Sequence, residues 1–161
     1  MALVRNQDYV FAPHVDVIMD KACFVGTEEH LFLVPDEAEK LPQSFREFMG
    51  GALSRTSTIE SLDLGGKTPR EVIAGLLEAP DMTLDELTAF FEGLKGSWDA
   101  VQVVKIADLV KLKVRAGMCG GSVTYKAKGN FGYTAMVTKI PKPESVEVQA
   151  FYAEAMAQVN A

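Results

Sequence analysis

The chain has 161 residues, of which 48% are apolar and 24% are charged, and its formal net charge at pH 7 is −6. This length and composition predict one globular domain, or one domain with a small satellite. An acidic chain lacks the basic surface that general nucleic-acid binding needs, so we expect no nucleic-acid partner. The apolar runs are too short to span a bilayer and the N-terminus shows no secretory signal, so we expect a cytoplasmic protein that is not transmembrane.

Strands are predicted in the first part of the chain. Residues 1–13 indicate an irregular or edge segment, because Pro13 ends regular structure. The alternation over residues 15–20 is typical of a weak strand. Two short apolar runs, over residues 22–25 and 31–34, then predict a hairpin with a loop of four or five residues.

The pattern changes to helical between residues 36 and 98. A hydroxyl stands three residues before a glutamate at Ser57, Thr68 and Thr83. Such a hydroxyl can accept a hydrogen bond from the first turn of a helix, while the glutamate reaches back to the cap N–H. Thr68 is the best supported start, because a proline follows it at the first helical position. An earlier helix is expected around residues 44–49, and we interpret the whole region as a helical insertion.

Strands are predicted again after Trp98. They cover the tract from residue 101 to 106, then residues 109–115, 122–127 and 131–139, and a helix over residues 144–159 ends the chain. The tract 109–115 alternates strictly, which predicts a half-buried strand with Val110, Leu112 and Val114 facing the core and a basic outer face.

Three segments of this layout resemble the pleckstrin-homology-like (PH-like) superfold, as in bacterial PH-like and GRAM-type domains. Thr27–Pro35 is similar to their early turn and strand ending in Val-Pro, Val104–Val114 to their middle strand pair joined at a bend, and Lys139–Tyr152 to their last strand and closing helix. The resemblance implies an α+β fold, an antiparallel β-sandwich or partly open barrel with a C-terminal helix and a helical insertion after the third strand. The β domain would comprise residues 1–35 and 99–161, and the insertion residues 36–98.

A basic strand face is the first candidate site. If the apolar residues of the strand at 122–127 share the core side, five cations share the outer side around the loop at 117–121, namely Lys111, Lys113, Arg115, Lys126 and Lys128. Charge and loop N–H groups would favour an anionic phosphate there. In PH-like domains, loops near such strands can hold phosphoinositide head groups, so the resemblance implies an acidic lipid or phosphate ligand. The alternative is a solvated, lysine-rich face that discourages edge pairing.

The insertion offers a second candidate, because it is rich in large apolar side chains. Phe90, Phe91, Leu94 and Trp98 are candidates for an apolar groove or a dimer face that binds a partner. The alternative is that these side chains pack on the sheet or on a neighbouring helix.

No catalytic motif stands beside His14 or His30, and the two cysteines, Cys23 and Cys119, do not form a pattern typical of metal ligands. We therefore expect no cofactor and no metal, with one thiol buried and one near a turn. The sequence predicts a non-enzymatic cytosolic interaction module or adaptor, which binds a protein partner or a second copy through the insertion or a sheet edge. The first alternative is a peripheral module that recognises acidic lipid or phosphate through the basic face. The second is an enzyme of unrecognised type, which would need a concave pocket with converging polar groups.

Overall fold

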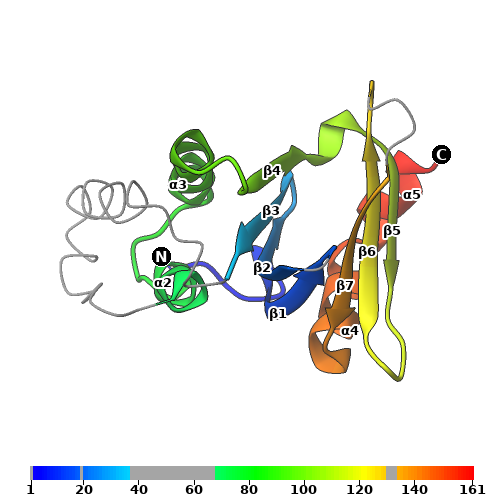
Figure 1. Ribbon diagram of the computed structural model, residues 1–161, viewed down its shortest axis with the longest axis horizontal. Coiled ribbons are helices and arrows are strands. Elements are labelled where there is room, and N and C mark those ends of the chain that lie inside the picture. Colours follow the sequence, from blue (N-terminus) through cyan, green and yellow to red (C-terminus); the bar gives the residue numbers. More distant parts are fainter. Residues whose placement is uncertain (1, 19, 37–67, 130–133) are drawn as a thin grey trace.

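The computed structural model describes residues 2–18, 20–36, 68–129 and 134–161. Seven antiparallel strands in this part of the chain form one curled sheet, a half-barrel, with the strand order β4-β3-β2-β1-β7-β6-β5 (Figure 1). The elements are β1 (Tyr9–Val17), β2 (Asp20–Thr27), β3 (His30–Pro35), α2 (Pro69–Leu77), α3 (Leu84–Ser97), β4 (Gln102–Lys105), the short 3₁₀ helix η2 (Ile106–Asp108), β5 (Leu109–Arg115), β6 (Gly121–Ala127), β7 (Ala135–Ile140), α4 (Lys142–Phe151) and α5 (Ala153–Val159). The predicted α+β class, with a helical insertion after the third strand and a C-terminal helix, is confirmed.

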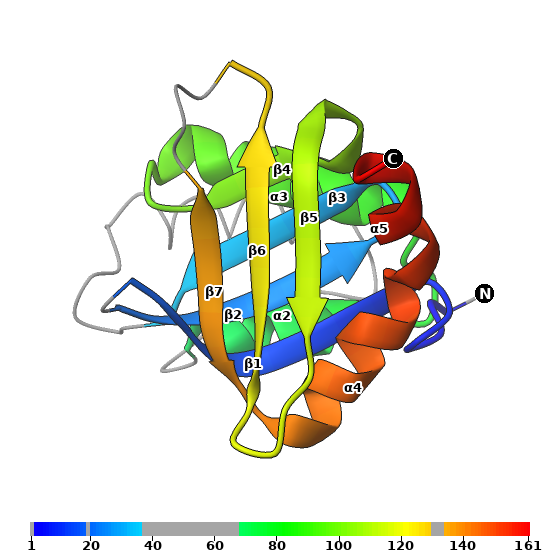
Figure 2. The same ribbon diagram turned by 90° about the vertical axis from the view of Figure 1, so that its right-hand side faces the viewer.

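The curl of the sheet creates three layers. Helices α2 and α3 lie on one side of strands β1–β4, and strands β5–β7 lie on the other side (Figure 1). In Figure 2 strands β5–β7 cross in front of β1–β4, with α4 and α5 along one flank and no described element over the front face. One face of β5–β7 is therefore open, whereas strands β1–β3 are sandwiched.

Sandwiching explains why the runs in β2 and β3 do not alternate. Side chains on one face of these strands, including Phe32, pack with α2 and α3 in a first core. Side chains on the other face, including Phe24, pack with β5–β7 and Tyr152 in a second core. A strand that is covered on both faces has no polar side to show, so it reads as a continuous apolar run.

Residues 2–8 are irregular, as predicted, but strand β1 begins at Tyr9 and continues through Pro13, so the prediction that Pro13 ends regular structure is wrong. The register between β1 and β2 shifts between Ala12 and Val15, which marks a bulge at the proline. A bulge leaves a residue without a ladder partner, so the missing N–H of proline costs no sheet hydrogen bond there.

Helices α2 and α3 begin where the hydroxyl–glutamate spacing predicts. The Thr68 hydroxyl accepts a hydrogen bond from the Glu71 backbone N–H at 3.4 Å, and the Thr68 N–H donates to the Glu71 carboxylate at 3.5 Å, which completes a capping box. The Thr83 hydroxyl accepts from the Glu86 N–H at 3.1 Å. The expected helices around Ser57 and over residues 44–49 lie outside the described residues.

The C-terminal helix is divided at Tyr152 into α4 and α5, and α5 covers the free edge of β5. The Asn160 side chain amide donates to the Leu112 carbonyl at 2.7 Å and accepts from the Leu112 N–H at 3.3 Å, as a neighbouring strand would. The Gln149 amide donates to the Val114 carbonyl at 3.4 Å. Helix side chains thus occupy hydrogen-bonding groups that an edge strand otherwise offers to another chain.

Asn160→Ala is expected to lower the free energy of unfolding by about 1–2 kcal/mol, since two hydrogen bonds to one strand residue are lost. Hydrogen exchange at the Leu112 amide should accelerate at the same time. Gln158→Ala, an exposed α5 position with no side-chain hydrogen bond in the described structure, is the matched control. Equal unfolding midpoints in urea for the two variants would show that Asn160 does not hold the edge.

Candidate functional site

The open face of strands β5–β7 carries the predicted cations, but not all five. Lys111, Lys113 and Arg115 alternate along β5 and are exposed, and Lys126 on β6 lies directly opposite Lys111. We call these four residues the basic face. Lys128 follows the end of β6 and lines a separate groove. Only Arg115 borders the loop at residues 116–120, because Lys111 and Lys126 lie at the other end of the strands.

The charges of the basic face are not neutralised. Among the described residues, none of its four side chains forms an ion pair or a hydrogen bond, and their outward neighbours Thr124 and the half-exposed Met136 are uncharged. Lys139 of β7 is also exposed, but it pairs with Asp16 of β1. Two lysines directly opposite each other repel, which costs stability in an antiparallel pair. Within the described structure, these four cations therefore lie close together without an internal partner.

Val110 does not face the core, contrary to the prediction for the alternating tract. The register between β5 and β6 shifts between Leu109 and Lys111, so Val110 occupies a bulge and its side chain is 45% exposed. Leu109 takes the buried position instead. The bulge leaves the outward direction of Lys111, Lys113 and Arg115 unchanged.

A small hollow extends the basic face at its loop end. Its volume is about 460 Å³, and Arg115, Lys139 and Gln149 line it together with the glycine-rich loop. Lys139 is already paired with Asp16 at 3.2 Å. Arg115 is thus the unpaired cation among the described residues that line this hollow.

The candidate partner-binding residues of the insertion mostly lie in the interior. Phe91 and Leu94 are fully buried, Trp98 is nearly so, and Phe90 is half-buried against the same core. Phe91 stacks on Phe32 of β3 with ring centroids 4.2 Å apart. In the described structure these side chains hold α3 on the sheet, so the expectation that they offer an apolar partner surface is not met by Phe91, Leu94 or Trp98.

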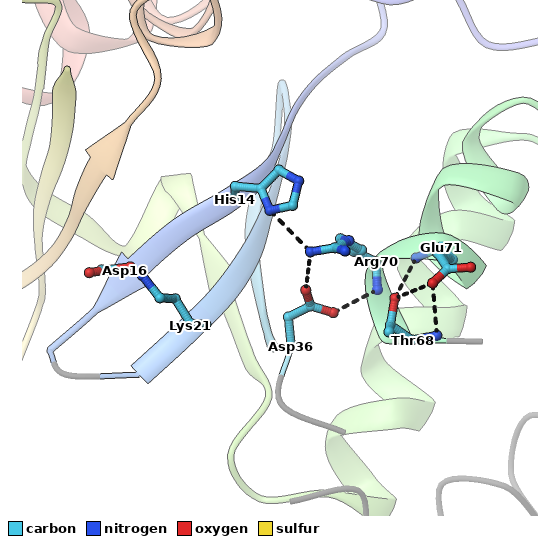
Figure 3. A network of polar contacts seen from close by, with 7 residues as sticks. All are labelled: His14, Asp16, Lys21, Asp36, Thr68, Arg70 and Glu71. Atoms are coloured by element: carbon cyan, nitrogen blue, oxygen red, sulfur yellow. Dashed lines mark hydrogen bonds and ion pairs between the residues drawn. The ribbon is translucent and has the colours of Figure 1, made fainter. Parts of the chain in front are cut away.

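A network of polar contacts joins α2 to the sheet (Figure 3). The Arg70 guanidinium donates to His14 Nδ1 and to the Asp36 carboxylate, each at 3.1 Å, and the Arg70 backbone N–H donates to Asp36 at 3.2 Å. Because arginine has no acceptor, His14 Nδ1 must be unprotonated in this contact. Burial raises the pKa of Asp36, and the Arg70 contacts oppose that rise. We interpret the network as a clamp on the first turn of α2.

A large groove lies between the β2–β3 turn and helix α5, and the sequence did not reveal it. Its volume is about 1450 Å³. His30 lines it, is 7% exposed, and has no hydrogen-bond partner at either ring nitrogen. The spacing of residues in the sequence did not indicate this groove, because its lining residues come from distant parts of the chain.

The described residues contain no group of three His, Cys, Asp or Glu side chains that could hold a metal ion. Of the two cysteines, Cys23 is buried and Cys119 is exposed near a turn. No described helix is long and apolar enough to cross a membrane. Comparison of the chain with models of protein families, with curated proteins and with solved structures gives no significant match.

Proposed function

We propose that the chain is a non-enzymatic interaction module with a PH-like core, and that its basic face binds an anionic surface of acidic lipid. The observation that carries the proposal is the set of four unpaired cations on an uncovered sheet face. The curled sheet, the strand order and the closing C-terminal helix are compatible with the PH-like resemblance. The cytoplasm remains the predicted location.

Charge arrangement favours the basic face over the insertion as the primary site. The large apolar side chains of α3 are committed to the first core, and α5 caps part of the β5 edge. Lys111, Lys113 and Arg115, by contrast, stand free to approach a surface. An anionic membrane attracts each nearby cation by about 1 kcal/mol, so several together give measurable, salt-sensitive binding.

Lys113→Glu is expected to weaken binding to vesicles containing phosphatidylserine by about 10- to 30-fold, since the reversal replaces one attraction with one repulsion. Co-sedimentation at low and at physiological ionic strength measures this change. Lys95→Glu is the matched control: it makes the same charge change at the end of α3, on the opposite side of the molecule. We expect it to leave vesicle binding within about twofold.

Two results would contradict the proposal. The first is equal loss of binding in both variants, which would indicate only a general effect of net charge. The second is that the wild type binds neutral phosphatidylcholine vesicles as tightly as vesicles containing phosphatidylserine. Competition with inorganic phosphate or inositol hexakisphosphate separates a lipid surface from a free phosphate ligand. A soluble competitor that displaces the vesicles indicates a site that binds a single phosphate or headgroup. Vesicle binding that persists in its presence indicates recognition of the extended lipid surface.

A further inference from the structure

The groove beside His30 is built from segments that are distant in sequence. The β2–β3 turn and η2 form one wall and α5 forms the other. The apolar part of its lining includes Ile106, Leu109, Phe151, Tyr152, Ala155 and Val159. A volume of about 1450 Å³ exceeds what most small-molecule sites offer, and it is large enough for a peptide segment.

The rim of the groove is acidic. Glu28 and Glu29 stand on the turn, Glu92 on α3 and Glu154 on α5, against two lysines, Lys105 and Lys128. None of these six side chains forms an ion pair within the described part of the chain. The groove therefore has an unneutralised excess of negative charge, which complements a basic ligand and repels the anions that suit the basic face.

His30 supplies the second, independent observation. Its ring is the outermost of a stack that continues through Phe32, at 5.4 Å, to Phe91. A neutral imidazole has one donor and one acceptor nitrogen, and here both are buried without a partner. Buried polar groups are nearly always hydrogen-bonded, and His30 is an exception among the described residues that line the groove.

We propose that this groove binds a short segment of a partner protein that carries both basic and apolar side chains. The apolar side chains of the segment contact the floor, its Lys or Arg residues pair with the glutamates of the rim, and a polar group of the segment hydrogen-bonds to His30. The site is distinct from the basic face and does not depend on it.

Selection from a library of random displayed peptides tests the proposal without a known partner. The wild-type chain is the bait, and Gln158→Trp, which fills the groove from an exposed position of α5, removes peptides that bind elsewhere. We expect the recovered peptides to combine apolar residues with an excess of Lys and Arg. Acidic peptides, or no recovery beyond that from Gln158→Trp, would overturn the proposal.

Charge reversal then tests the best recovered peptide by fluorescence anisotropy. Glu154→Lys should weaken its binding at least tenfold. Glu144→Lys makes the same reversal in the first turn of α4, outside the groove, and should change binding less than twofold. Equal affinities of the two variants would refute the acidic rim as the binding determinant. Lys113→Glu should leave peptide binding intact, so failure of the basic-face proposal is distinguishable from failure of this one.

His30→Phe keeps an aromatic ring on the stack but removes both nitrogens. We expect the peptide to bind several-fold more weakly while the circular dichroism spectrum and melting temperature are maintained or improved, since a buried unpaired polar group is lost. Unchanged peptide affinity would remove His30 from the site. Sedimentation of the wild type without peptide completes the test, because a concentration-dependent dimer that Glu154→Lys abolishes would make a second copy the occupant instead.

Discussion

Replacing Phe91 by alanine is expected to lower the free energy of unfolding by about 3–5 kcal/mol, the usual cost of deleting a buried phenylalanine ring. The ring is fully buried between α3 and β3 and stacks on Phe32 at 4.2 Å. Its removal leaves a cavity at the centre of the first core, where helix and sheet cannot both move to close it. Urea unfolding followed by circular dichroism measures the loss.

Phe90→Ala is the matched control, because the two residues are adjacent and their rings meet edge to face at 5.3 Å. Phe90 is only half-buried, so we expect Phe90→Ala to lower the free energy of unfolding by less than half as much as Phe91→Ala. This pair separates two interpretations of the insertion. A loss below about 1 kcal/mol for Phe91→Ala would contradict its core role, because a docking side chain on the surface contributes little to folding.

Local hydrogen-bonding rules made the helices of the insertion predictable. A capping hydroxyl and glutamate interact within one turn, so Thr68 and Thr83 identify the starts of α2 and α3 without any knowledge of the sheet. The outward direction of Lys111, Lys113 and Arg115 was predictable for a similar reason, since alternation along a strand is a local property.

Features that depend on pairing between distant segments were not predictable. The bulges at Pro13 and Val110 arise from register between neighbouring strands, and register is set by packing across the sheet. The amphipathic pattern of residues 144–159 continues across Tyr152, although the helix divides there. Likewise, His30 gave no signal, because its partners in the groove come from η2 and α5, about 75 to 130 residues further along the chain.

The large aromatic content of the insertion was ambiguous for a physical reason. A helix with one apolar stripe must bury it, but the stripe does not specify whether the covering surface belongs to the same chain or to a partner. The resolution comes from β2 and β3, whose continuous apolar runs have a second face to cover. A helix with an apolar stripe, together with strands that have no polar side, predicts that the helix packs on those strands.

Gly26→Ala is expected to lower the free energy of unfolding by about 2–4 kcal/mol, because the cost of overpacking adds to the cost of losing a buried hydrogen bond. A Cβ at this position would overlap the Tyr152 hydroxyl and lie 2.9 Å from two of its ring carbons. That hydroxyl is fully buried and donates to the Thr27 carbonyl at 2.8 Å. The His30 carbonyl is a second acceptor, 3.3 Å from the same hydroxyl. Burial raises the pKa of Tyr152 well above its usual value, so the phenol stays a neutral donor.

A double-mutant cycle with Tyr152→Phe tests the cause. Removing the hydroxyl relieves part of the overlap, so we expect Gly26→Ala with Tyr152→Phe to cost about 1 kcal/mol less than the sum of the single variants. Additive costs would show that the overlap is not responsible. Gly96→Ala is the contrasting control: it lies in α3 with nothing within 4 Å of an added Cβ, so it should stabilise the chain by about 0.5–1 kcal/mol.

The contact between Gly26 and Tyr152 also affects the groove. The Tyr152 hydroxyl is hydrogen-bonded to the β2–β3 turn, and Glu28, Glu29 and His30 at this turn line the groove. Gly26→Ala should therefore weaken a groove-bound peptide while leaving vesicle binding through Lys113 unchanged, as measured by anisotropy and co-sedimentation on the folded variant. Equal effects on both ligands would indicate a general loss of structure. A selective effect would show that a glycine with no side chain of its own positions the recognition turn, by leaving room for the hydroxyl that ties the turn to the closing helix.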